Sequence, residues 1–161
     1  LTPGTSYTDG ESFVSNGITV DAFDRTNFSG GAAQVSAPSD AGAINGMFIE
    51  NVALEFHLPF PVSYIQFNFA EYGGNVFLSV NDAQTAVTSF SVLDGVTLGG
   101  IDIVVDGLAR GAPFVSLTGN ITQFAFGLED GEIDNVYYIP APAAAPLLAL
   151  GALGAARRRR R

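Results

Sequence analysis

Short runs in which apolar and polar side chains alternate fill most of residues 17–139, and glycine, asparagine and aspartate separate these runs. In the run 62–69, Ile65, Phe67 and Phe69 share one face, and the polar residues between them share the other. A period of two residues is that of a β-strand with one buried face, and no stretch here has a convincing helical period. About ten such runs with closely spaced turn residues are typical of an antiparallel β-sandwich. The sequence therefore predicts an all-β fold, and among sandwiches we expect a jelly-roll.

The expected strands follow directly from these runs. Their ranges are 17–23, 33–36, 47–49, 52–58, 62–69, 75–80, 85–92, 96–98, 101–106, 114–117, 121–126 and 132–139. Gly73-Gly74 and Asp94-Gly95 are interpreted as turns between strands, because glycine accepts the backbone conformations that turns require.

Residues 140–161 consist of three consecutive parts. They are a proline-rich segment, 140–146, an apolar segment, 147–156, and a cluster of arginines, Arg157, Arg158, Arg159, Arg160 and Arg161. As a helix, residues 141–156 would span about 24 Å, slightly less than the hydrocarbon core of a bilayer. Under the positive-inside rule, the arginine cluster lies on the cytoplasmic side and stops translocation. We therefore expect a β domain over 1–139 and a C-terminal transmembrane sorting segment over 140–161.

The motif at the start of this segment is Ile139-Pro140-Ala141-Pro142-Ala143-Ala144. Proline motif, apolar helix and arginine cluster together resemble the C-terminal sorting signals of the PEP-CTERM class, in the variant that reads Val-Pro-Leu-Pro-Ala. The sorting motif would be Pro140, Ala141 and Pro142, with Ala141 where the main class has glutamate. The resemblance implies a Gram-negative bacterium, export through the inner membrane and recognition by an exosortase. The alternative is an ordinary C-terminal anchor that is never cleaved.

The acidic balance of the chain narrows its partners. The formal net charge is −9, and the C-terminal cluster supplies most of the 7 basic residues that stand against 16 acidic ones. The acidic domain that precedes the arginine cluster should repel nucleic acid and anionic membranes, and it should attract divalent cations. Without cysteine, the chain forms neither a disulfide framework nor a thiolate metal site. Export would require an N-terminal signal peptide, which we expect was removed or lost from a fragment, because the sequence starts at Leu1 without one.

A second resemblance is carried by four segments of the body, 54–69, 73–81, 117–124 and 132–137. Together they look like an uncharacterised β-sandwich that often precedes these sorting signals, and the likeness spans most of residues 7–139. The Ile-Asp-Asn-Val sequence at 133–136 is similar to the last strand of many jelly-roll carbohydrate-binding modules. The resemblance implies a fold and a setting at the cell surface, and no established activity.

The densest group of carboxylates lies at residues 129–134. Jelly-roll modules often hold a structural calcium ion between their first and last strands. By that resemblance, Asp134 would be joined by Asp9 or Glu11. The alternative is a solvated acidic turn whose aspartates bend the backbone. Strict alternation would place Asp134 on the face of the following even-numbered residues, where burial would demand a cation or several donors; a bulge at Asp134-Asn135 would turn it outward.

Catalytic chemistry has little support in the sequence. His57 is the one histidine, which excludes a multi-histidine metal site, and it lies in the middle of a strand without a nucleophile-elbow sequence elsewhere. An outward-facing strand residue is the preferred interpretation of His57. The candidates for stacking on a sugar or a partner are Tyr64 and Tyr72, and Phe77 and either Tyr137 or Tyr138 could also lie on outward faces.

These observations favour a non-enzymatic, exported protein of the cell surface or extracellular matrix. Its expected partners are an exosortase-type sorting enzyme and the inner membrane, with no nucleic acid. The first alternative is a calcium-stabilised carbohydrate-binding module for extracellular polysaccharide. A secreted glycoside hydrolase ranks third, because it would need a cleft with two carboxylates at catalytic separation.

Overall fold

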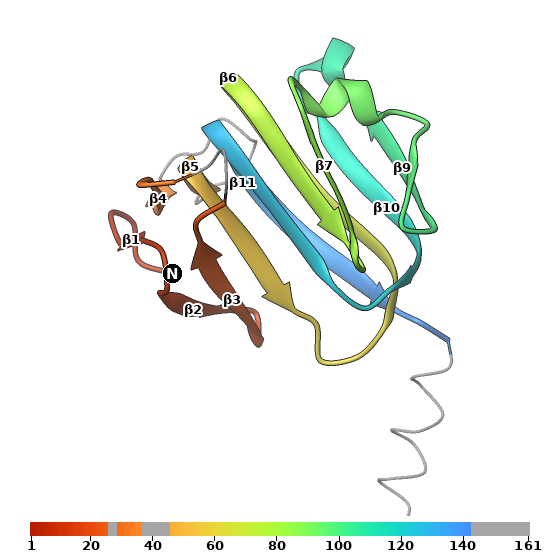
Figure 1. Cartoon of the computed structure of the whole chain (residues 1–161), viewed down its shortest axis with the longest axis horizontal. Coiled ribbons are helices and arrows are strands. Elements are labelled where there is room, and N and C mark those ends of the chain that lie inside the picture. Colours follow the sequence, from red (N-terminus) through yellow and green to blue (C-terminus); the bar gives the residue numbers. More distant parts are fainter. Residues whose placement is uncertain (26–28, 37–45, 143–161) are drawn as a thin grey trace, which may run out of the picture.

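The computed structural model describes residues 1–25, 29–36 and 46–142 (Figure 1). They form one antiparallel sheet in the order β1-β4-β5-β11-β6-β10-β9-β8, with β3 beside β5, β2 beside β3, and β7 beside β6. The prediction of an all-β, antiparallel fold is confirmed. The strands are β1 (Ser6–Tyr7), β2 (Ser12–Ser15), β3 (Ile18–Phe23), β4 (Ala32–Ser36), β5 (Gly46–His57), β6 (Val62–Val80), β7 (Ala83–Val87), β8 (Thr97–Leu98), β9 (Ile101–Asp106), β10 (Phe114–Ile121) and β11 (Phe124–Pro140), with 3-10 helices η1 (Phe90–Leu93) and η2 (Leu108–Arg110).

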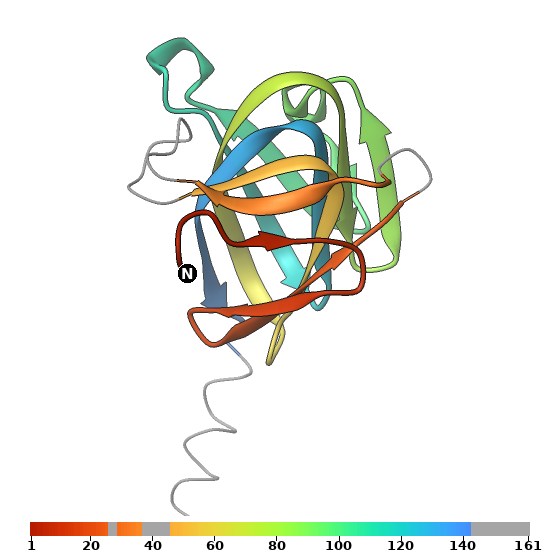
Figure 2. The ribbon, with the colours of Figure 1, turned by 90° about the vertical axis from the view of Figure 1, so that its left-hand side faces the viewer.

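Three long strands, β5, β6 and β11, each contribute to two layers. Residues 62–68 of β6 pair with β10, whereas residues 76–80 pair with β7. We call the layer that holds β10, β9, β8, β4 and β1 the β10 sheet, and the layer that holds β7, β3 and β2 the β7 sheet. Figure 2 shows the long strands arching from one layer into the other. The arrangement is sandwich-like, with corners made by strands that change sheets.

The bends of the three strands lie beside one another. Asn51 in β5 and Gly74 in β6 have φ of 50° and 78°. In β11 the register with β6 shifts around Asp130, which pairs with Gly73 on one side and Glu50 on the other. The expected turn at Gly73-Gly74 is therefore wrong, because the chain bends there without leaving the sheet. For the same reason the separate runs 47–49 and 52–58 form one strand that ends at His57. Residues 124–126 likewise join the run 132–139 in β11, whereas Ile121 ends β10.

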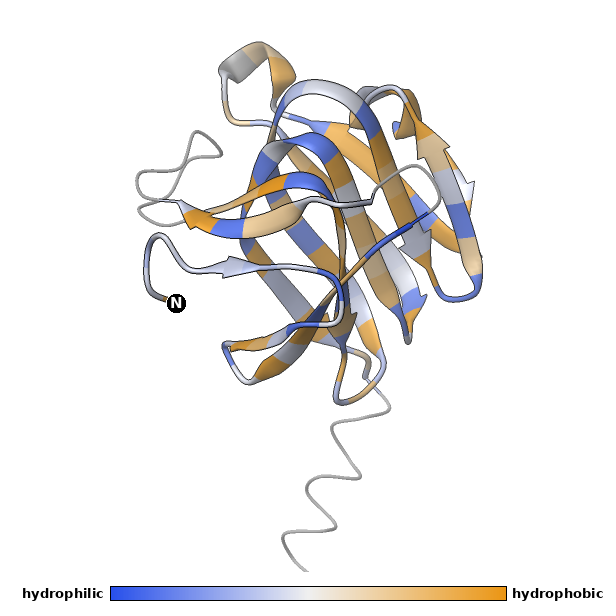
Figure 3. Cartoon of the chain, turned by 60° about the vertical axis from the view of Figure 1, so that its left-hand side comes forward, coloured by the Kyte–Doolittle hydropathy of each residue, from blue (hydrophilic) through white to orange (hydrophobic). Residues whose placement is uncertain are grey.

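The core lies between the inner faces of the two layers. Ile65, Phe67 and Phe69 are buried, as the period of two predicted. The Phe67 ring of the β10 sheet stacks on Phe126 of the β7 sheet at 5.1 Å between centroids and lies 5.8 Å from Phe124. Figure 3 shows hydrophobic and hydrophilic residues alternating along the long strands. Packing of aromatic rings across the two layers is what holds them together.

The run 85–92 does not form the predicted strand over its whole length. The strand β7 ends at Val87, and residues 90–93 form the 3-10 helix η1. The Glu71 carboxylate accepts hydrogen bonds from the Phe90 N–H at 2.6 Å and from the Ser89 hydroxyl at 2.8 Å. These bonds satisfy the start of η1, and Phe90 is fully buried against Phe67 and Phe69. Contacts with residues distant in the sequence, namely the bonds to Glu71 and the burial of Phe90, thus outweigh the local strand pattern.

The described chain leaves the sheet at the end of β11. Pro140 is paired with Val62, and the Ala141 N–H donates to the carbonyl of Pro61 at 3.0 Å. Residues 1–25, 29–36 and 46–142 include no helix with the length and apolar character needed to cross a membrane. The predicted apolar helix and the cluster Arg157 to Arg161 lie outside the described residues.

Candidate functional site

The outward side of the β10 sheet carries a row of four side chains that are neighbours in register. Tyr137 of β11 pairs with Gln66 of β6, Gln66 with Ser116 of β10, and Ser116 with Val104 of β9. Tyr137 and Val104 are 46% and 48% exposed, unusually high for large side chains in the middle of a sheet. Alternation places all four residues opposite the buried face that holds Ile65 and Phe67.

A second row runs beside the first. Ile139 of β11 pairs with Tyr64 of β6, Tyr64 with Thr118 of β10, and Thr118 with Asp102 of β9. Ile139 is 49% exposed, and Thr118 and Asp102 are also exposed. We call these two rows together the tyrosine face. Its tyrosines lie on β11 and β6, hydroxyl side chains lie on β10, and the β9 side carries Val104 and the Asp102 carboxylate.

Tyr64 and Tyr137 form the centre of the tyrosine face. Their ring centroids are 5.6 Å apart with planes inclined by 42°, and the Tyr64 hydroxyl donates to Oε1 of Gln66 at 2.7 Å. The hydrogen bond with Tyr64 is the main cause that raises the pKa of Tyr137. The Tyr137 phenol therefore stays neutral near pH 7, and hydroxyls and an amide lie beside two ring faces. Such a set can stack on an apolar face and bond to hydroxyl groups around it.

Tyr72, the other predicted stacking residue, lies elsewhere. It is 48% exposed and stacks on Phe48 at 6.3 Å between centroids. Along β6 it is eight positions from Tyr64, which corresponds to about 26 Å at the usual rise per residue. The structure places both residues outward, but it pairs Tyr64 with Tyr137 rather than with Tyr72. Phe77 is buried instead, with the Arg25 guanidinium 4.3 Å from its ring centroid.

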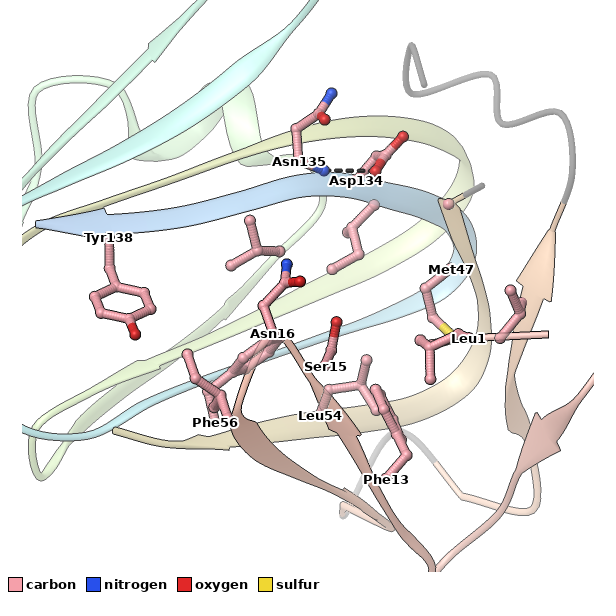
Figure 4. Close-up of a pocket in the computed structure, with 15 residues that line it drawn as sticks. Leu1, Phe13, Ser15, Asn16, Met47, Leu54, Phe56, Asp134, Asn135 and Tyr138 are labelled. Carbon is pink, nitrogen blue, oxygen red and sulfur yellow. Dashed lines mark hydrogen bonds between the residues drawn. The ribbon is translucent and has the colours of Figure 1, made fainter. Parts of the chain in front are cut away.

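A bulge in β11 decides which tyrosine faces outward. Asn135 has φ of 51°, and the register with β6 jumps between Asp134 and Tyr137. The extra residue moves the inward face from Ile133 to Tyr138, which packs against the core, and leaves Tyr137 outside. The Asp134 carboxylate accepts the Asn135 N–H at 2.6 Å, and Figure 4 shows both side chains turned away from the side that Tyr138 faces. The bulge that the sequence left as an alternative is thus present.

A cavity of about 280 Å³ opens between the layers at the end formed by the β2–β3 hairpin (Figure 4). Apolar side chains from five strands, β2, β3, β4, β5 and β11, line it, including Phe13, Met47, Leu54, Phe56 and Ile133. Ser15, Asn16 and Tyr138 add polar atoms to the lining. The alternation of apolar and polar residues did not predict this cavity. Its lining combines the β2–β3 hairpin with β11, which are far apart in the sequence.

The three predicted calcium ligands occupy separate local arrangements. Asp9 accepts the N–H of Asp24 at 2.9 Å, and Glu11 accepts the N–H and the hydroxyl of Thr8 at 2.7 and 3.0 Å. The backbone bond from Thr8 is the main cause that lowers the pKa of Glu11. In the described parts of the chain, no three His, Cys, Asp or Glu side chains are placed to hold a metal ion. The structure therefore does not show these three carboxylates as one metal-binding group.

His57 is exposed on β5, as predicted, and pairs with Asp21 of β3 at 2.6 Å between Nε2 and Oδ2. A hydrogen bond from Ser12, followed by the bond to His57, lowers the pKa of Asp21. Serine, aspartate and histidine thus meet, but the carboxylate lies between the other two. In a hydrolytic triad the imidazole lies in the middle and removes the proton from serine, so this arrangement lacks that route.

No protein-family profile, curated protein sequence or solved structure matches this chain.

Proposed function

We propose that this chain is a non-catalytic, exported surface or matrix protein, sorted by an exosortase-type enzyme that acts on its C-terminal segment. The observation that carries the proposal is where the sheet ends. Pro140 is the last residue of β11, so the motif Pro140-Ala141-Pro142 begins at the end of the last strand of the sheet. Pro140 and Pro142 are exposed, which leaves this junction open to an enzyme.

The same geometry limits where such an enzyme could cut. Pro140 is paired with Val62, and Ala141 is bonded to Pro61, so peptide bonds up to residue 141 are held by the sheet. Proteolytic enzymes need a freely extended segment in their active site. We therefore expect cleavage on the C-terminal side of Pro142, which would leave the whole of β11 in the mature protein.

Expression of the full chain behind a signal peptide, in a Gram-negative host with and without an exosortase, tests this function. We expect the mass of the surface or secreted protein to correspond to a chain that ends after Pro142, only when the exosortase is present. Replacing both Pro140 and Pro142 with alanine should abolish processing, whereas Pro3→Ala in an exposed N-terminal position should not. An uncleaved chain that stays in the inner membrane under all conditions would contradict the proposal and favour a permanent anchor.

A second candidate function, supported by the tyrosine face, is binding of extracellular polysaccharide. Here the domain would serve as a jelly-roll-like carbohydrate-binding module. The paired rings of Tyr64 and Tyr137, with the Gln66 amide beside them, offer apolar faces and hydrogen-bonding groups on one surface. Sugar rings have the matching chemistry, since their C–H faces stack on aromatics and their hydroxyls bond at the edges. Because the rows also carry Asp102, a neutral glycan fits better than an anionic one.

Affinity electrophoresis of the full chain in gels that contain neutral polysaccharides tests this second function. Tyr137→Ala and Tyr64→Ala should each remove most of the retardation. Tyr72→Ala is the matched control, because Tyr72 is equally exposed but lies outside the tyrosine face. Equal effects of the three substitutions, or no retardation by any neutral glycan, would reject the tyrosine face as a sugar platform.

Calcium belongs to this second function as its proposed structural cofactor. If the ion binds at Asp134 with Asp9 or Glu11, millimolar calcium should raise the melting temperature of the full chain by several degrees, and magnesium should not. The substitution Asp134→Ala should remove the effect. Equal shifts with both cations would instead indicate that the cations screen an acidic body, without a specific site.

A further inference from the structure

The cavity between the layers has the character of an internal binding site. Apolar side chains form its walls, and Figure 4 shows Phe56 opposite Tyr138 at one side and Phe13 near Met47 at the other. An apolar cavity of about 150 Å³ accommodates a benzene molecule. At about 280 Å³, this one has room for a ligand of roughly ten non-hydrogen atoms.

The opening of the cavity is polar and rigid. Ser15 is the last residue of β2, and Asn16 and Gly17 form the turn to β3. The φ angles of these two turn residues are 50° and 80°. Positive φ at both positions is the signature of the tight hairpin turn that Asn-Gly favours, so Asn16 is held in place. The groups that contribute polar atoms here are the Ser15 hydroxyl, the Asn16 amide and the Tyr138 phenol, each of which can donate and accept hydrogen bonds. They can bond to a neutral head group.

Charge argues against an acidic ligand. The one carboxylate among the lining residues, Asp134, is turned away from the side that Tyr138 faces, and no lysine or arginine lines the cavity. A carboxylate or phosphate that entered would lose its hydration without gaining a cationic side chain as its partner. The apolar walls and the hydrogen-bonding side chains at the opening together favour a ligand that has an apolar group and an uncharged polar group.

We propose that this cavity binds a small neutral amphipathic molecule, consisting of an aryl or short alkyl group with a hydroxyl or amide head. The apolar group lies among Phe13, Met47 and Phe56, and the head bonds to Asn16 and Ser15. This inference does not depend on sorting by the C-terminal segment or on sugar binding by the tyrosine face. Those lie on other parts of the domain.

Met47 provides a specific probe, because it is the chain's single methionine and lines the cavity. The full chain, labelled at the methionine methyl group and kept soluble in an amphipol, is titrated with 4-methylbenzyl alcohol or with 4-methylbenzoate. The two compounds share their shape and differ in charge. We expect the alcohol to shift the Met47 methyl resonance saturably, with a dissociation constant on the order of 1 mM, and the benzoate to bind at least tenfold more weakly.

Two variants and a matched control complete the test. Ser15→Phe should fill the opening and weaken binding of the alcohol at least tenfold. Val14→Phe adds the same ring to the same strand on its exposed outer side, and it should leave binding unchanged. Asn16→Gly keeps the turn but removes the amide, so it should weaken the alcohol severalfold and leave toluene unaffected. No saturable shift, equal binding of the benzoate, or equal effects of Ser15→Phe and Val14→Phe would overturn the proposal.

Discussion

Four asparagines in the described part of the chain share one conformational role. Within the described residues, every non-glycine residue with positive φ is an asparagine, namely Asn16, Asn51, Asn81 and Asn135. Asn16 and Asn81 lie in two-residue hairpin turns, Asn51 lies at a strand bend, and Asn135 lies at a bulge. Asparagine tolerates the left-handed region better than most residues, because its short side chain bonds to the nearby backbone. Asn16, Asn51 and Asn81 lie outside the strands that the sequence predicts, whereas Asn135 lies inside the predicted strand 132–139, where a bulge was only the alternative.

Asn81 should contribute much to stability. Its Oδ1 accepts the Thr122 N–H at 2.9 Å and hydroxyl at 3.0 Å, and its Nδ2 donates to the carbonyls of Asn120 at 3.1 Å and Gly99 at 3.4 Å. We expect Asn81→Ala to lower the free energy of unfolding by about 3 kcal/mol, through lost bonds and left-handed strain. Asn81→Gly should cost about 1 kcal/mol less, because glycine relieves the strain. Urea unfolding measures both, and a loss below 0.5 kcal/mol for alanine would contradict the role.

The pH dependence of stability should reflect Asp21 and Glu11. Hydrogen bonds lower the pKa of both carboxyls in the folded state, Asp21 through Ser12 and then His57, and Glu11 through Thr8. A folded pKa below the unfolded one adds stability that is present above the unfolded pKa and lost as pH falls through the folded value. The urea concentration at the unfolding midpoint should therefore decrease as the pH is lowered from 5 to 3. The decrease should be modest, because both carboxyls are exposed.

The variant Asp21→Asn isolates one of these groups. It removes the ionisable carboxyl, so the fall in the urea midpoint below pH 5 should become shallower than in the wild type. Asp82→Asn is the control, because that carboxyl belongs to neither set of hydrogen bonds. An unchanged slope in Asp21→Asn would show that the bonds from Ser12 and His57 carry no net stability.

At the scale of elements, the sequence predicts which face of each bent strand is buried, but it does not predict how long these strands are. Turns between strands and bends within a strand both use residues that accept positive φ. The local sequence therefore predicts the end of a strand in both cases. Asn51, Gly74 and Asp130 become bends because three adjacent strands curve at the same level and keep their partners. That condition is non-local. It explains why single faces such as Ile65, Phe67 and Phe69 were predicted correctly while the lengths of β5, β6 and β11 were not.

The candidate site shows the same division. The outward position of Tyr64 followed from period two alone, because no irregularity lies between it and the buried residues of its strand. The choice between Tyr137 and Tyr138 required the bulge at Asn135, and the contact with Tyr64 required the register of β11 on β6. The burial of Phe77 depended on Arg25, which comes from a distant part of the sequence.

The corner of β11 should require glycine at position 131. A Cβ added there would lie 2.5 Å from the carbonyl oxygen of Ala70 and 2.9 Å from Cδ1 of Leu128. We expect Gly131→Ala to lower the free energy of unfolding by about 3 kcal/mol, because backbone would have to move. Gly73→Ala is the matched control at the same corner, with no heavy atom within 4 Å, and it should stay within about 0.5 kcal/mol. Equal urea midpoints for the two variants would show that the corner adapts freely.

For the whole molecule, the order of strands bears on how an exported chain folds. The strand β11 is the last in sequence, yet it lies between β5 and β6 in the middle of the sheet. Neither neighbour can complete its pairing until residues 124–140 are present. Such non-local pairing is slow to form, because distant segments must meet before the contacts stabilise them. A chain that folds only after its last strand is available would remain open during passage through a membrane, as export would require.

Truncation tests this dependence and the limits of the domain together. Every described strand pair lies within residues 6–140, so a chain that ends after Pro142 should unfold in urea at the same midpoint as the full chain. Ending the chain after Asp134 removes Val136 and Tyr138, which pack against the core, and the pairs of residues 137–140 with β6. We expect that chain to lose cooperative unfolding altogether. If instead the cut after Pro142 destabilised the domain, residues beyond 142 would belong to the folded unit, and separation of body and sorting segment at residue 140 would be wrong.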